Sequence, residues 1–220
     1  MTELAANGEP VHAEQALVLL HGRWYKPSTM QDLVERVDLP GVNCVTPAAR
    51  DGSWYPERFM DPRAVNEPGL SRAIAQVHET LDRLAAEGVA PERTILGGFS
   101  QGACLACEAL AQRPRPLAAL VVLCGGLMGA DEDELVKPAA GALDGLPVLL
   151  TATEQDSWIP VERVERTAAI LTAAGALVDL RIYPPAPHEV HPDEVAALRG
   201  LLLELRMAGS APRSLSGSPS

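Results

Sequence analysis

Short apolar runs alternate with longer amphipathic segments along most of the chain. The apolar runs carry few charges, which is typical of strands buried on both faces of a sheet. Strands are expected over 15–20, 42–46, 94–96, 117–124, 147–152 and 176–183. In the segments between them, apolar residues recur every three or four positions. This spacing predicts helices over 30–37, from 70 to a C-cap at 88, and over 103–112, 161–174 and 193–207.

Alternating strands and helices predict an α/β fold, with a mostly parallel sheet covered by helices on both faces. We expect a single domain over residues 15–207, a flexible N-terminus over 1–14 and a disordered tail over 208–220, which is rich in Ser, Pro and Gly. The segment 48–68 contains three prolines and shows no regular period. Such a long irregular segment is usually a functional loop or a packed flap.

The composition is that of a globular protein, and it narrows the range of partners. Hydrophobic residues make up 47% of the 220 residues, and 29 acidic against 18 basic residues give a net charge of −11. Without concentrated positive charge, nucleic acid and anionic membrane surfaces are not expected as partners. The N-terminus has no signal-peptide pattern and no apolar run is long enough to span a bilayer, so we expect a cytoplasmic protein.

The four cysteines and one acidic run raise the question of a metal site. Cys104 and Cys107 form a C-x-x-C within a predicted helix, while Cys44 and Cys124 stand singly in predicted strands. Buried free thiols are the expected state of all four. The acidic run 131–134 fits no calcium loop and is expected to be a solvated helix start. We expect no metal.

The strongest chemical signal is the Gly-x-Ser-x-Gly centred on Ser100. The β-branched segment 94–96 precedes it and the Ala-rich segment 103–112 follows it, so Ser100 stands on a strand-to-helix turn. Such a turn projects the hydroxyl outward, and Gly98 and Gly102 remove Cβ atoms that would clash in it. Ser100 is therefore the candidate nucleophile.

Other polar residues follow the predicted strands at the edge where Ser100 is expected. Asp156 and His188 come after later strands, which produces the chain order Ser…Asp…His of an α/β-hydrolase. In this interpretation His188 takes the proton of Ser100, and Asp156 orients the imidazole. Glu154 is a competing acid, and Asp156 could instead be a helix N-cap. His191 is a competing base, although it precedes a proline at a helix start.

Two backbone N–H groups are candidates for an oxyanion hole. Gln101 follows Ser100 at a helix N-terminus, and Arg23 follows His21-Gly22 at the end of the first strand. Three aromatic residues are candidates for substrate binding: Trp24, Trp54 and Tyr55. Each has an alternative interpretation in the core, where Trp24 would pack on the Trp54–Tyr55 loop.

Taken together, these motifs resemble the phospholipase/carboxylesterase family of serine hydrolases. The resemblance rests on Leu20-His21-Gly22, on 98–102, on Asp156 with Ile159-Pro160, and on Tyr183-Pro184 followed by His188. It implies an α/β-hydrolase with little or no cap domain, acting on carboxylic esters or thioesters without a cofactor. It also allows for a homodimer.

The expected function is hydrolysis of esters of small to medium acyl groups through an acyl-enzyme on Ser100. A thioesterase, or a hydrolase that tailors a biosynthetic product, would use the same triad. A binding protein on a hydrolase fold is the alternative from another class.

Overall fold

Six strands form one sheet in which every neighbouring pair runs parallel, in the order β2-β1-β3-β4-β5-β6. The computed structural model describes residues 15–132 and 134–210. The strands are β1 (Gln15–Leu20), β2 (Val42–Val45), β3 (Thr94–Phe99), β4 (Ala119–Leu123), β5 (Pro147–Thr153) and β6 (Leu177–Tyr183). All four central strands are buried, as their uninterrupted apolar sequences predict.

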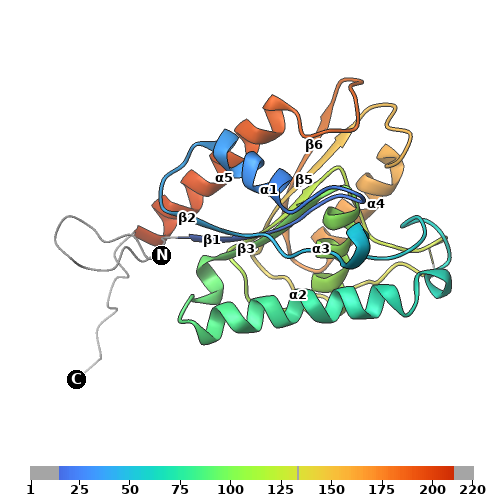
Figure 1. Cartoon of the computed structure of the whole chain (residues 1–220), viewed down its shortest axis with the longest axis horizontal. Coiled ribbons are helices and arrows are strands. Elements are labelled where there is room, and N and C mark those ends of the chain that lie inside the picture. The colour runs from blue at the N-terminus through green and yellow to red at the C-terminus, as the bar shows by residue number, and fades with distance from the viewer. Residues whose placement is uncertain (1–14, 133, 211–220) are drawn as a thin grey trace.

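Helices cover both faces of the sheet (Figure 1). The α-helices are α1 (Ser28–Val37), α2 (Gly69–Ala86), α3 (Gln101–Gln112), α4 (Val161–Ala173) and α5 (Pro192–Ser210). Helices α1 and α5 pack on one face, against Leu17 and Leu19 of β1. Helices α2, α3 and α4 pack on the other, against Ala16, Val18 and Leu20. Because successive strand residues face opposite sides, β1 contributes to both halves of the core.

The edge strand β6 differs from the prediction of apolar strands throughout. Its residues alternate between partly buried and exposed, and Leu177 is 65% exposed. An edge strand has a neighbour on one side only, and here Asp179 and Arg181 pair with each other on the surface. Charged residues of this kind discourage edge-to-edge association.

The structure differs from the prediction at the end of the last helix and at the acidic run 131–134. Helix α5 continues past the predicted end at 207 to Ser210, so the expected tail begins with helix; residues 211–220 and 1–14 lie outside the described residues. Among the described residues of the acidic run, no helix begins. Pro138 would end such a helix after about two turns. Instead, Glu132 pairs with Arg166 and Lys137.

The segment 48–68 is folded onto the core rather than extended from it. It contains two short 3₁₀ helices, η1 (Arg50–Gly52) and η2 (Arg63–Asn66); a third, η3 (Pro91–Arg93), precedes β3. Trp54, Tyr55 and Phe59 are buried in this segment. It lies beside α3 at the carboxyl end of the sheet, which makes it part of the wall around Ser100.

Candidate active site

Ser100 lies in the turn between β3 and α3, with a left-handed backbone (φ 54°, ψ −119°). Its N–H donates to the carbonyl of Leu123 at 2.9 Å, which extends the pairing of β3 with β4 by one residue. A Cβ on Gly98 would lie 2.6 Å from the carbonyl oxygen of Leu20 and from the backbone of Gly102. The glycines therefore allow the turn to pack directly on the end of β1.

Ser100, His188 and Asp156 are brought together by this edge of the sheet. The Ser100 hydroxyl lies 2.7 Å from His188 Nε2, and His188 Nδ1 lies 2.6 Å from Asp156 Oδ2. Ser100 follows β3, Asp156 follows β5 and His188 follows β6. Asp156 and His188 lie 56 and 88 positions after Ser100 in the chain, but the parallel strands bring all three residues to one edge. With Nδ1–H donating to Asp156, Nε2 is the atom that can accept the serine proton.

The Asp156 carboxylate is held by backbone donors as well as by the imidazole. Its Oδ1 accepts from the N–H groups of Trp158 at 2.7 Å and Ile159 at 3.1 Å. Burial alone would raise the pKa of Asp156, but hydrogen bonds from His188 and Trp158 keep that pKa below its ordinary value. The carboxylate form, which can accept from an imidazole, is thereby favoured.

The competing acid and base lie elsewhere. Glu154 is exposed, and its backbone N–H donates to the carbonyl of Tyr183. His191 stands at the start of α5, where its N–H donates to Glu194 and its ring contacts the carbonyl of Pro187 at 3.0 Å. His188 thus contacts Ser100 directly, and Asp156 contacts His188.

The two backbone groups considered for an oxyanion hole both border Ser100. Gln101 is the first residue of α3, where a backbone N–H has no acceptor within the helix. Within the part of the chain that the structure describes, the N–H of Arg23 has no hydrogen-bond acceptor, whereas that of Trp24 donates to Gly52. A Cβ on Gly22 would lie 3.5 Å from the Ser100 Cβ, so the Arg23 turn passes close to Ser100.

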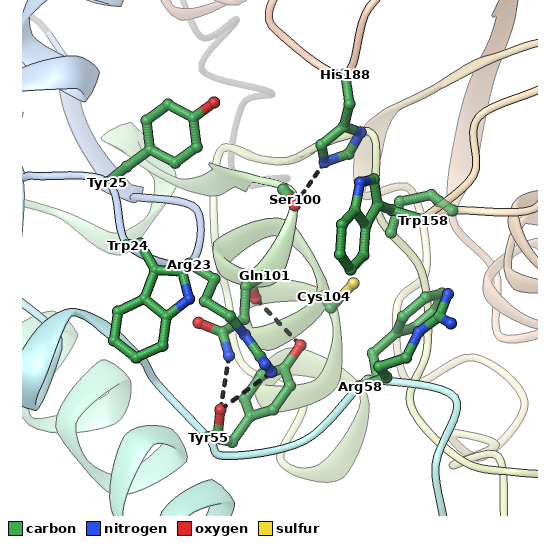
Figure 2. Close-up of a pocket in the computed structure, with 12 residues that line it drawn as sticks. Arg23, Trp24, Tyr25, Tyr55, Arg58, Ser100, Gln101, Cys104, Trp158 and His188 are labelled. Carbon is green, nitrogen blue, oxygen red and sulfur yellow. Dashed lines mark hydrogen bonds between the residues drawn. The ribbon is translucent and has the colours of Figure 1, made fainter.

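His21 and the Gln101 side chain hold this turn and the segment 48–68 together. His21 Nε2 accepts from the N–H of Ala49 at 3.0 Å, and the His21 carbonyl accepts from the indole N–H of Trp54 at 2.8 Å. The Gln101 amide accepts from the Trp54 N–H. It also donates to the Tyr55 carbonyl, as Figure 2 shows. These buried hydrogen bonds join segments that lie far apart in the chain.

A cavity of about 390 Å³ opens beside Ser100 (Figure 2). Besides Ser100 and His188, the residues that line it are Arg23, Trp24, Tyr25, Tyr55, Arg58, Phe59, Gln101, Cys104, Trp158 and Ile159. Aromatic side chains dominate the wall, and the indoles of Trp24 and Trp158 lie on opposite sides of it. Such a cavity suits a small ligand with apolar parts.

The three predicted substrate-binding aromatics have different positions. Trp24 is 73% exposed and Tyr55 is buried, and both line the cavity. Trp24 is therefore not a core residue, although its indole also lies close to Gly52 of the segment 48–68. Trp54 does not line the cavity: it is buried behind it and stacks obliquely on His21, with ring centroids 5.0 Å apart.

Several lining residues could not be found from the sequence. Arg58 and Phe59 lie in the irregular segment, where no period indicates which side chains face inward. Trp158 lies two residues after Asp156, in a turn that the sequence places near the site but does not orient. Cys104 faces the cavity from α3, and burial raises the pKa of its thiol to about 12.

The structure also brings Cys124 close to Asp156 and His188. One potential ligand atom from each lies within 4.8 Å of the others. The Asp156 and His188 atoms are engaged in the hydrogen bonds described above, and Cys124 Sγ contacts the buried Glu194 at 3.6 Å. Burial raises the pKa of the Cys124 thiol, which disfavours the thiolate that binds metals. All four cysteines are free thiols; Cys104, Cys107 and Cys124 are buried and Cys44 is partly so.

Comparisons with known proteins place the chain in a family. The family model described as Phospholipase/Carboxylesterase matches residues 4–203. A crystal structure of a phospholipase/carboxylesterase from Dyadobacter fermentans is 31% identical, with a TM-score of 0.82 over 92% of this chain and 95% of that one. A carboxylesterase from Mesorhizobium loti is 25% identical, with a TM-score of 0.72 over 86% and 88%.

Curated relatives match over shorter stretches. The acyl-protein thioesterase 1 of Gibberella zeae is 28% identical over 135 residues, which is 61% of this chain and 57% of that protein. The chain spans about half the length of the first curated relatives it matches. The extent of the family match nevertheless leaves no ambiguity about membership: this chain belongs to the phospholipase/carboxylesterase family and has its α/β-hydrolase fold.

Proposed function

We propose that this protein is a serine hydrolase that cleaves carboxylic esters of small to medium acyl groups. The observation that carries the proposal is the unbroken chain of hydrogen bonds from Ser100 through His188 to Asp156 beside an aromatic cavity. Membership of the phospholipase/carboxylesterase family supports the same chemistry.

In the proposed reaction, Ser100 Oγ attacks the ester carbonyl as its proton passes to His188 Nε2. The N–H groups of Gln101 and Arg23 stabilise the oxyanion of the tetrahedral intermediate. When the intermediate collapses, the carbon–oxygen bond to the alcohol breaks and His188 returns the proton to the departing oxygen. Water then attacks the acyl-enzyme by the same route, releasing the acid and restoring Ser100.

Thioester hydrolysis is the second candidate, favoured by the acyl-protein thioesterases among the relatives. Esters and thioesters form the same tetrahedral intermediate, so one site accommodates both reactions. Parallel assays with p-nitrophenyl esters and acyl-CoAs of matched chain length would rank the two. In the part of the chain that the structure describes, no helix has the length and apolar character needed to cross a membrane. The cytoplasmic location and the homodimer stay predictions.

A fluorophosphonate probe tests the proposal directly, because it reacts with activated serines. We expect labelling of Ser100, located by peptide mapping, and a loss of esterase turnover of roughly 10⁴–10⁶ in Ser100→Ala. The variant should keep the circular dichroism spectrum and melting temperature of the wild type. Labelling elsewhere, or turnover near wild type in the variant, would remove Ser100 from the mechanism. Absence of both labelling and turnover in the wild type would favour a binding protein on a hydrolase fold.

A further inference from the structure

The charge lining the cavity is opposite in sign to that of the whole molecule. The chain has a net charge of −11, yet Arg23 and Arg58 line the cavity. Among the described residues, no Asp or Glu side chain lines it. Local cations in an acidic protein raise the concentration of an anionic ligand at one place while the rest of the surface repels it.

Arg58 presents its guanidinium group at the mouth of this cavity. The guanidinium carbon lies 5.6 Å from the ring centroid of Trp158, and Nη2 donates to the carbonyl of Ser157 at 3.4 Å. A guanidinium carries five N–H donors. Within residues 15–132 and 134–210, this is the only hydrogen bond that the Arg58 side chain makes, and it forms no ion pair.

Arg23 is held in place by neutral groups. Its Nη2 donates to the backbone carbonyls of Tyr55, at 3.3 Å, and of Glu57. Carbonyl oxygens orient a guanidinium without cancelling its charge. Figure 2 shows the Arg23 side chain extending along the cavity between Gln101 and Tyr55.

Carbonyl partners alone do not distinguish these arginines, since Arg36, Arg163 and Arg199 outside the cavity also donate to backbone carbonyls. Several arginines outside the cavity pair with carboxylates at hydrogen-bond distance: Arg115 with Asp82, Arg181 with Asp179 and Arg166 with Glu132. Arg23 and Arg58 differ from both groups in position, because they line the cavity beside Ser100 with carbonyl and indole neighbours. Two uncompensated guanidinium groups facing the nucleophile's cavity indicate a ligand that brings its own negative charge.

We propose that the ester cleaved at Ser100 carries an oxyanionic group, a carboxylate or a phosphate, which Arg58 binds together with Arg23. This inference rests on the proposed function and narrows its substrate class. The apolar wall formed by Trp24, Trp158 and Phe59 contacts the rest of the substrate. Discrimination arises because an anionic ester gains charge-assisted hydrogen bonds from the guanidinium groups, which a neutral ester cannot form.

The test compares esters that differ in one terminal group. The acyl series consists of the p-nitrophenyl esters of hexanoate, of adipate and of 5-phosphonopentanoate, which place a methyl, a carboxylate or a phosphonate after the same four methylenes. The alcohol series consists of the hexanoyl esters of 4-hydroxybenzamide and 4-hydroxybenzoate. For each ester, kcat/KM is measured after subtraction of the rate with Ser100→Ala. Within each series, the kcat/KM of an anionic ester is then divided by that of the neutral ester.

We expect the ratio in one of the two series to fall about tenfold in Arg58→Gln, the size expected for one charge-assisted hydrogen bond. Intrinsic ester reactivity cancels, because each ratio is compared between enzymes. Arg58→Lys should recover part of the loss. Arg93→Gln is the matched control: Arg93 is exposed and precedes β3 at the opposite end from Ser100, so the same change of charge should leave the ratio unchanged.

The outcomes separate the two proposals. If the neutral esters are cleaved through Ser100 but both ratios are equal in wild type and Arg58→Gln, the anionic substrate class is wrong while the hydrolase stands. The same conclusion follows if Arg93→Gln lowers the ratio as much as Arg58→Gln. If no ester is turned over faster than by Ser100→Ala, the proposed function itself fails. The carboxylate and phosphonate members of the acyl series tell the two oxyanions apart.

Discussion

At the scale of single residues, His188 and His191 lie three positions apart and have different surroundings. His188 Nε2 lies 2.7 Å from the Ser100 hydroxyl, while the His191 ring contacts the carbonyl of Pro187. The difference follows from Pro192, which starts α5 and makes His191 the residue immediately before the first turn, where its carbonyl accepts from the N–H of Val195. His188 remains in the preceding loop, from which it reaches back over the sheet edge.

Substitution of the two histidines tests this assignment. His188→Ala should lower kcat by roughly 10⁴–10⁶, because Ser100 loses its base. His191→Ala should change kcat less than about tenfold, since the N–H that donates to Glu194 belongs to the backbone and is retained. Both variants should be compared with wild type on one p-nitrophenyl ester, with melting temperature as the check on folding. Equal losses, or a greater loss at His191, would overturn the assignment.

The residues of the triad and those of the cavity wall differ in how far the sequence predicts them. Ser100, Asp156 and His188 each follow a strand that the sequence predicts, so the parallel topology brings them to one edge. Arg58 faces the cavity because its segment is fixed by contacts with distant residues. Nothing in the local sequence indicates that Arg58 faces a cavity. Trp54, which is predicted to bind substrate, instead supports the wall through its hydrogen bond to the His21 carbonyl.

At the scale of elements, the segment 48–68 shows where pattern reasoning ends. The regular helices and strands follow their predicted positions to within two or three residues, because periodicity is a local property. The irregular segment owes its shape to hydrogen bonds with His21 and Gln101 and to an ion pair with Glu108, which belong to other elements. The sequence shows that this segment is unusually long and rich in aromatic residues. Its path cannot be predicted from the sequence, because that path depends on contacts with the folded core.

The ion pair between Arg63 and Glu108 joins this segment to α3. Arg63 Nη1 lies 2.7 Å from Glu108 Oε1, and the Glu108 side chain is fully buried. Glu108 also accepts from the N–H of Met128 at 3.1 Å, so one carboxylate connects three parts of the chain. Removing the arginine would leave a buried charge with only neutral donors, which is costly.

Arg63→Ala should therefore lower the free energy of unfolding by about 2–3 kcal/mol, somewhat less than for a fully buried pair because Arg63 is 22% exposed. Arg83→Ala is the matched control: it breaks an exposed i,i+4 pair with Glu87 and should cost less than about 0.5 kcal/mol. Urea unfolding at pH 7 measures both. A loss at Arg63 no larger than at Arg83 would show that the pair does not hold the segment.

At the scale of the whole molecule, charge acts on stability in two opposing ways. The net charge of −11 at pH 7 produces self-repulsion, which is relieved as carboxylates gain protons. Against this, three carboxyl groups among the described residues have a pKa below the ordinary value. Hydrogen bonds from Arg166 lower the pKa of Glu132 to about 2, and a hydrogen bond from Arg115 lowers that of Asp82. The third is Asp156, as described above.

The sign of the pH effect follows from these shifts. A carboxyl group with a lower pKa in the folded protein contributes stability that is fully present above its ordinary pKa, 3.8 for Asp and 4.5 for Glu. That contribution is lost as the pH falls through the folded value. Between pH 7 and 5 the relief of repulsion should dominate, whereas below about pH 4 the loss of the three contributions should dominate.

We therefore expect the free energy of unfolding, measured in urea at constant ionic strength, to be greatest near pH 5 and to fall steadily towards pH 2. Glu132→Gln provides the internal check. It removes the titrating group but keeps the shape of the side chain, so any difference from wild type seen at pH 6 should shrink to nothing as the pH approaches 2. A wild-type stability that continues to rise below pH 4 would mean that self-repulsion outweighs the bound carboxylates throughout. A difference that stays constant with pH would show that Glu132 stabilises the fold by packing rather than by its charge.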